Sequence, residues 1–173
     1  MPIASDQTML DILERVRNRF YGKYRGTVTD IDASTLRIKA TVPSVLGTQP
    51  TGWAMPCVPY AGDNVGIAFL PEQGSGVWIE FEGGDVSYPI WVGGYWRDGE
   101  VPPDVGAAVK VIVTKAPVEL KFDDDQESLT ITDSNGNTVS LDSSGITLSR
   151  GGSTVAVSDS SVSVNDSALE VQS

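Results

Sequence analysis

Residues 129–171 read LTITDSNGNTVSLDSSGITLSRGGSTVAVSDSSVSVNDSALEV, and this stretch decides the fold. Apolar residues recur in pairs two positions apart, and polar turn residues separate the pairs. Side chains two positions apart lie on the same face of a strand, so each unit predicts a short strand with two inward side chains, followed by a corner. Successive pairs begin 10, 7, 9, 7 and 7 positions apart: Leu129/Ile131, Val139/Leu141, Ile146/Leu148, Val155/Val157, Val162/Val164 and Leu169/Val171.

The repeat predicts an assembly of several copies. Two aliphatic side chains per strand are too few to offset the conformational entropy that the ribbon loses on ordering. Backbone pairing with a partner strand and a shared apolar axis are therefore expected. Three intertwined chains supply both; a single-chain β-helix is the alternative, although so short a repeat would leave both its ends bare. The residues expected to fill the axis are Ile131, Val139, Leu141, Ile146, Leu148, Val155, Val157, Val162 and Val164.

The aromatic residues mark a different architecture upstream. Of the 13 aromatic residues, 12 lie between Phe20 and Trp96, and the remaining one is Phe122. Charge is divided in the same way, with a net +2 over residues 1–40 and −13 over residues 41–173. The chain therefore changes from a packed aromatic core to a ribbon of small, polar and aliphatic residues.

Short alternating segments between Tyr24 and Trp96 predict strands, and turn residues separate them. The expected strands are 26–31, 36–42, 65–69, 77–81 and 90–95, with a long Pro- and Gly-bearing loop from Pro43 to Gly52. Five or six short strands after a helix fit a closed barrel of the OB type. Alternation in residues 77–82 places Val77, Ile79 and Phe81 on the core face.

A short amphipathic helix is expected at the start, because Met9, Ile12, Leu13, Val16 and Phe20 recur at helical spacing. Its apolar stripe must pack on its own barrel or on a neighbouring subunit, and the sequence does not decide between them.

The predicted fold class is all-β: a short N-terminal helix, a five- to six-stranded OB-type barrel and a C-terminal intertwined trimeric β-helix. The expected boundaries are 1–22 for the helix, 23–97 for the barrel, 98–118 for a linker with one possible strand at 109–114, and 119–173 for the needle.

Composition excludes several classes of function. The net charge of −11 disfavours a polyanion as partner, and no nucleic acid is expected. Histidine is absent, which removes His-dependent catalysis and imidazole metal sites. Cys57, the lone cysteine, is expected to be a buried thiol. No secretory leader is predicted, so synthesis in the cytoplasm is expected.

Polar motifs have simple interpretations. Glu80 and Glu82 share a strand face without an apolar pocket, which favours a solvated face over a glycosidase-like pair. Asp123-Asp124-Asp125 with Glu127 lacks the spacing of a calcium loop, and Asp133–Asn137 is expected to be a turn. The four tryptophans have acidic neighbours, which favours core or subunit contacts at Trp53, Trp78 and Trp91, together with Phe81.

The barrel segment resembles a known family. The motifs are Trp53-Ala54-Met55-Pro56, Gly62-Asp63, Pro71-Glu72, residues 77–85 (VWIEFEGGD) and residues 88–93 (YPIWVG). They are similar to the OB domain of contractile-tail spike proteins: phage baseplate assembly protein V, the central spikes and the related VgrG proteins of type VI secretion. The acidic tail is similar in architecture to their trimeric needle.

The resemblance implies a homotrimeric, non-enzymatic spike, with an OB collar on the baseplate hub or tube-initiator protein and a needle that pierces the target cell envelope. Some relatives carry a lysozyme domain or an iron-binding His-x-His apex, but the linker is too short for the first and the chain lacks histidine for the second. No cofactor is expected. A separate PAAR-like tip protein would dock on the end at Leu169 and Val171. The location would be a virion baseplate or an extracellular contractile particle.

Two other functions stay open at this point. One is an OB-fold nucleic-acid-binding protein with a disordered acidic tail. The other is a trimeric glycan-binding fibre, with Trp53 or Trp96 as the sugar platform.

Overall fold

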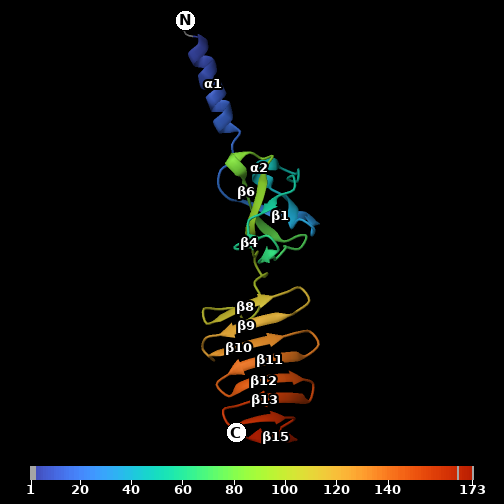
Figure 1. Ribbon diagram of the computed structural model, residues 1–173. Coiled ribbons are helices and arrows are strands. Elements are labelled where there is room, and N and C mark those ends of the chain that lie inside the picture. The colour runs from blue at the N-terminus through green and yellow to red at the C-terminus, as the bar shows by residue number, and fades with distance from the viewer. Residues whose placement is uncertain (1–2, 167, 173) are drawn as a thin grey trace. The chain divides into compact units, whose positions relative to one another are not determined.

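The computed structural model describes residues 3–166 and 168–172, and the chain divides into two compact units, Met1–Glu100 and Val101–Ser173. Each unit has its own sheet (Figure 1). Strands predominate in both, which confirms the predicted all-β class with a short N-terminal helix.

The first unit is built on a five-stranded sheet in the order β2-β1-β6-β7-β3. The sheet closes into a barrel because the backbone N–H of Ala54, next to β3, donates to the carbonyl of Ile38 in β2 at 2.7 Å. The strands are β1 (Tyr24–Asp32), β2 (Arg37–Thr41), β3 (Met55–Pro56), β6 (Gly76–Phe81) and β7 (Pro89–Tyr95). The connections contain α2 (Pro43–Leu46), β4 (Ala61–Gly62), β5 (Val65–Gly66) and η1 (Glu82–Gly84).

The core of the barrel follows the alternation of its strands. In β6, Val77, Ile79 and Phe81 are buried, as the sequence predicts, while Trp78 and Glu80 are only half-buried. Burial of these large side chains is the main stabilising contribution in so small a unit. The buried core consists of Val28, Ile38, Ala40, Val42, Ala54, Val77, Ile79, Phe81 and Trp91.

The segment 57–70 differs from the sequence prediction. A strand was expected over 65–69, but β5 covers Val65–Gly66 alone and pairs with β4. Beyond it, the N–H of Ile67 donates to the carbonyl of Tyr60 at 2.9 Å, and Phe69 is exposed. Residues 65–69 alternate between apolar and other side chains, but no neighbouring strand is long enough to pair with the whole segment.

Helix α1 spans Ile3–Arg17, and its described apolar side chains are exposed. Met9 is 62% exposed and Val16 is 66% exposed. Of the two packing partners open at the sequence level, the chain's own barrel is therefore not the one that covers this stripe.

The second unit is an eight-stranded antiparallel sheet in which each strand pairs with the next along the chain, from β8 to β15 (Figure 1, yellow to red). Its strands are β8 (Val109–Val113), β9 (Glu119–Asp123), β10 (Ser128–Thr132), β11 (Asn137–Asp142), β12 (Gly145–Arg150), β13 (Ser153–Val157), β14 (Ser161–Val164) and β15 (Leu169–Gln172). Strand β8 lies inside the range 98–118, which the sequence assigned to a linker with one possible strand at 109–114.

The strands of the second unit pair within one chain, whereas the sequence predicted pairing between chains. Backbone pairing with other chains was expected, but the turns are tight enough that each strand folds back on the preceding strand of the same chain. Antiparallel neighbours joined by short turns are the simplest sheet topology. The backbone is thus paired within one chain, whereas the apolar side chains are not covered by it.

Candidate functional site

Two columns of apolar side chains run across the second sheet on one face. Residues directly opposite each other in an antiparallel pair share a face, and the strand registers align every apolar pair of the repeat. Val139 lies opposite Leu148, which lies opposite Val155. The first column is Phe122, Leu129, Leu141, Ile146, Val157, Val162 and Val171, and the second is Ile112, Leu120, Ile131, Val139, Leu148, Val155, Val164 and Leu169.

These columns contain all nine residues predicted to fill an axis, and Leu169 and Val171, predicted to form a docking end, lie on the last strand. The sequence analysis missed the upstream extension at Ile112, Leu120 and Phe122. Leu120 and Phe122 carry the same signal as the repeat, an apolar pair two positions apart, one unit earlier. The apolar face is therefore longer than the predicted one.

The apolar face is open in a single chain. From β11 to β14, six of its eight side chains are between 37% exposed (Leu141) and 48% exposed (Leu148), and Val139 and Val164 are half-buried. On the last strand Leu169 and Val171 are 63% and 64% exposed. A continuous apolar surface of this length is typical of a protein–protein interface, because covering it removes aliphatic area from water.

The opposite face of the same sheet is polar and composed mostly of hydroxyl side chains. In register across the strands lie Lys121, Thr130, Ser140, Thr147, Ala156 and Ser163. The two faces thus differ as the inside and the outside of an assembly do.

Carboxylate turns fix the register of the columns. One Oδ of Asp133 accepts the backbone N–H groups of Asn135 and Asn137, both at 2.9 Å, and the other accepts the side-chain amide of Asn137 at 2.6 Å. These hydrogen bonds from Asn137, and then those from Asn135, lower the pKa of Asp133 to about 2. Hydrogen bonds from Ser144 likewise lower the pKa of Asp142. Such turns set which residues face each other, and so keep the apolar pairs aligned.

Acidic residues do not converge on a common point. Within residues 3–166 and 168–172 there is no group of three or more acidic or cysteine side chains placed to hold a metal ion. Asp124 forms an ion pair with Lys110, and the turn at Asp133–Asn137 is satisfied by its own hydrogen bonds.

The four barrel residues predicted to make core or subunit contacts lie in different environments; they are Trp53, Trp78, Phe81 and Trp91. Phe81 and Trp91 are buried in the barrel core, and the indole N–H of Trp91 donates to the carbonyl of Leu36 at 3.1 Å. Trp78 packs beside Tyr95. Trp53 is 42% exposed, and the Lys39 ammonium lies 4.8 Å from its ring centroid.

Two side chains singled out in the sequence have structural surroundings. Glu80 forms an ion pair with Lys23 on the outside of β6. Cys57 is exposed, so the prediction of a buried thiol was wrong. Its backbone N–H donates to the carbonyl of Trp91 at 2.8 Å, which places the residue beyond the short β3 with its side chain outside the core.

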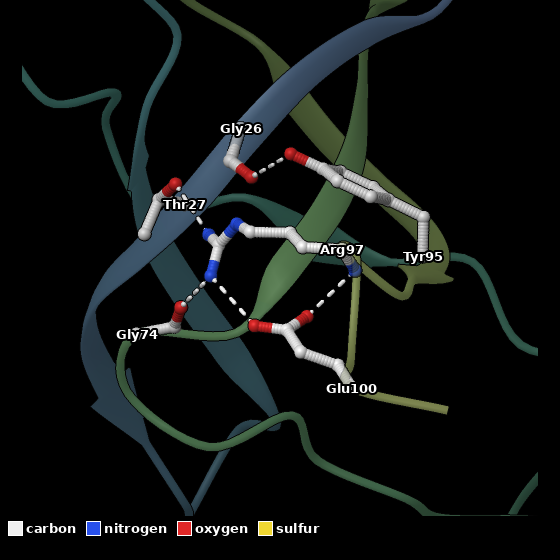
Figure 2. A network of polar contacts seen from close by, with 6 residues as sticks. All are labelled: Gly26, Thr27, Gly74, Tyr95, Arg97 and Glu100. Atoms are coloured by element: carbon white, nitrogen blue, oxygen red, sulfur yellow. Dashed lines mark hydrogen bonds and ion pairs between the residues drawn. The ribbon is translucent and has the colours of Figure 1, made fainter. Parts of the chain in front are cut away.

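Arg97 fixes the point where the chain leaves the barrel (Figure 2). Its guanidinium donates to the carbonyl of Gly74 at 3.1 Å, to the hydroxyl of Thr27 at 3.0 Å and to the carboxylate of Glu100 at 3.2 Å. The backbone N–H of Arg97 also donates to Glu100 at 2.7 Å, and this bond is the main cause that lowers the pKa of the Glu100 carboxyl. The last residues of the first unit are thereby held against β1 and the loop before β6.

Comparison with known families matches both units separately. The model of the type VI secretion system/phage-baseplate injector OB domain matches residues 24–96. The model of the phage baseplate V C-terminal trimerisation domain matches residues 109–170, which include both apolar columns except Val171. The chain belongs to the phage baseplate V family. A search of curated proteins finds no match to it.

The baseplate V family has a structural role in the baseplates of phages and type VI secretion systems, and this protein is a baseplate spike-type component. The uncovered face of β8–β15 lies in its trimerisation domain, which explains why one chain leaves two columns of aliphatic side chains open. Among the described helices, none combines the length and the hydropathy that crossing a bilayer requires.

Proposed function

We propose that the protein is the central spike of a contractile tail or contractile injection system, and that it acts mechanically as a trimeric, membrane-piercing needle. The observation that carries the proposal is the pair of apolar columns across β8–β15 in a trimerisation domain. Three identical sheets that turn these faces toward a common axis would bury both columns and leave the hydroxyl faces in water.

The needle axis in this proposal consists of the nine predicted residues and their upstream extension. From β10 to β15 each chain contributes two aliphatic side chains per strand, so each level of the trimer encloses six of them. Close packing of such side chains resists compression, and every strand from β9 to β14 is hydrogen-bonded on both edges. A rod of this kind would transmit the force of sheath contraction to a small area of the target envelope.

One partner is proposed for each unit. A baseplate hub or tube-initiator protein would bind the OB collar. In the second unit, β15 is an edge strand of the described sheet, and Leu169 and Val171 are among its most exposed side chains. Exposed edge strands and apolar ends are normally covered, and a PAAR-like tip protein of conical shape is the proposed cover.

Solution mass and particle imaging test the proposal. The purified protein should be a trimer that resists SDS at room temperature, and a density map of the assembled particle should show it between the tube and the tip. A monomer in solution, or a particle in which the protein lies outside the central axis, would refute the spike assignment. Deleting residues 169–173 should abolish tip binding while the trimer and the barrel persist.

A mechanical role also predicts the absence of wall-degrading activity and of metal dependence. The family is structural. Among the carboxylates that resemble catalytic or metal-binding groups, Glu80 and Asp124 form ion pairs and Asp133 accepts turn hydrogen bonds. Zymography on peptidoglycan and thermal unfolding with and without EDTA are the measurements. Clearing of the wall substrate, or a large decrease in melting temperature with EDTA, would contradict the proposal.

A further inference from the structure

The apolar stripe of α1 is a second unpartnered surface, far in sequence from the trimerisation domain. Met9, Ile12, Leu13 and Val16 are between 53% and 66% exposed. With 3.6 residues per turn these four positions cover an arc of roughly 100° of the helix. Leu10, 60% exposed, lies at the border of this stripe.

The barrel does not cover the stripe, because the described side chains of α1, apolar and polar alike, are exposed and the helix extends away from the barrel (Figure 1). Asp11, Glu14, Asn18 and Arg19 line a shallow cleft together with Asp85 of the barrel. Arg19 forms an ion pair with Asp85 at 3.1 Å. Asp11 and Glu14 lie about half a turn away from Met9 and Val16 around the helix. The described contact between this region and the barrel thus lies just after the end of the helix, and the apolar stripe is left uncovered.

A rigid anchor holds the end of the helix. The N–H of Phe20 donates to the carbonyl of Gly84 at 2.9 Å, and the Phe20 ring packs edge-on against Tyr24 and Phe81. Gly84 is buried with φ of +77°, and a Cβ at this position would lie 3.0 Å from the N of Phe20. The chain is thus fixed on each copy of the barrel three residues after the helix ends at Arg17.

We infer that the α1 helices of the three copies pack on one another through this stripe as a parallel three-helix bundle. The inference rests on the proposed homotrimer. The spacing of Met9, Leu13 and Val16 is four and then three residues, which is the a/d pattern of a helix seam. Ile12 and Leu10 then occupy the flanking g and e positions.

Charge distribution favours identical copies as the occupant. A threefold axis brings the same side chain of each copy together, so a charge in the seam would face two like charges. From Met9 to Val16 no a, d, e or g position is charged, and Asp11 and Glu14 fall at the outer f and b positions. The same register places Asp6 at an a position and Arg17 at an e position, so the uncharged seam is limited to the middle of the helix. The stripe is in this sense compatible with itself.

Tethering supplies the stability that the short helix lacks. A helix of 15 residues is marginal in water by itself. Covalent linkage to a trimer gives the other two copies an effective concentration on the order of millimolar. The bundle then joins the three chains at a second place, at the opposite end of the sequence from β8–β15.

Cysteine cross-linking in the full-length protein tests the inference. Cys57 is exposed and is first replaced, as Cys57→Ala. In that background Leu13→Cys places a thiol in the seam, and Asp11→Cys places one on the polar side as the matched control. Mild oxidation in dilute solution should convert most Leu13→Cys trimers to a covalent dimer plus one free chain, whereas Asp11→Cys should stay uncross-linked.

The solution mass of the same samples distinguishes failure of the helical bundle from failure of the proposed homotrimer. A trimer without a Leu13→Cys cross-link, or with equal cross-linking at both positions, overturns the bundle and leaves the spike proposal standing. A monomer in the Cys57→Ala parent overturns both. Val16→Asp gives an independent test. Helical circular dichroism should decrease while the trimer mass and the overall tryptophan fluorescence are kept, and an unchanged helical signal would contradict the inference.

Discussion

Replacing Val155 by Asp is the sharpest test of the apolar axis. Val155 is opposite Leu148 and Val164 in the second column and is 37% exposed in a single chain. Covering that remaining area in the trimer contributes roughly 0.5–1 kcal/mol per chain, since full burial of a valine contributes about 1.5–3 kcal/mol. The carboxylate adds a desolvation cost of several kcal/mol per ion.

Three copies of the substitution meet at one level of the axis, so the total cost is on the order of ten kcal/mol per trimer. That is comparable to the whole free energy of unfolding of an ordinary domain, about 5–15 kcal/mol. We therefore expect Val155→Asp to lose the SDS-resistant trimer while the barrel stays folded. Gel mobility without boiling, solution mass and Trp fluorescence are the measurements.

Ala156→Asp is the matched control, because Ala156 lies on the hydroxyl face opposite Thr147 and Ser163. The same charge one position away should leave the trimer intact. Acidification should partly rescue Val155→Asp, because an apolar environment raises the pKa of the new carboxyl and the protonated form costs less to bury. An equally resistant Val155→Asp trimer, or equal damage from both substitutions, would refute the assignment of this face to the axis.

Three further predictions concern the turns and the barrel. The pKa of Asp133 is about 2 in place of 3.8, so its contribution to stability is complete above about pH 4 and is lost as the pH falls through 2. Asp133→Asn should therefore lower the melting temperature at pH 7 and weaken the dependence of the melting temperature on pH between 4 and 2. An unchanged dependence on acid pH would count against the role of the turn. Gly84→Ala should destabilise the barrel by about 1–2 kcal/mol in denaturant titrations, because a φ of +77° is unfavourable for alanine and its Cβ would press on the backbone N of Phe20. Gly83→Asn is the control: Gly83 has a φ of +58° and open space around it, so this substitution should change the free energy of unfolding little. Arg97→Ala should cost about 1–2 kcal/mol through its lost hydrogen bonds and speed hydrogen exchange over residues 96–100, and wild-type exchange there would show that the exit of the chain is held by something else.

The apolar columns were predictable from sequence because period-two spacing alone decides which side chains share a face. The barrel core at Val77, Ile79 and Phe81 followed from the same rule. The partner of each strand was not predictable in this way, since apolar spacing is the same whether the next strand belongs to the same chain or to another. Turn geometry decides that question, and it depends on hydrogen bonds such as those of Asp133 with Asn137.

Other differences arise where local pattern and tertiary surroundings disagree. Residues 65–69 alternate as a strand does, but the structure offers them only the two-residue β4 as a neighbour. Cys57 lies in an apolar stretch and yet is exposed, because β3 ends before it. Arg97 had no sequence signal at all: its partners Thr27 and Gly74 are far away along the chain.

The strictly sequential order of β8 to β15 makes the length of the second unit adjustable. No strand is inserted between two others, so a duplicated or deleted hairpin leaves every remaining strand beside its former neighbour. Each added hairpin contributes two strands and lengthens the sheet by roughly 10 Å, at about 4.8 Å per strand. Evolution or design can therefore change the reach of this protein in hairpin-sized steps while the barrel and its contacts stay as they are.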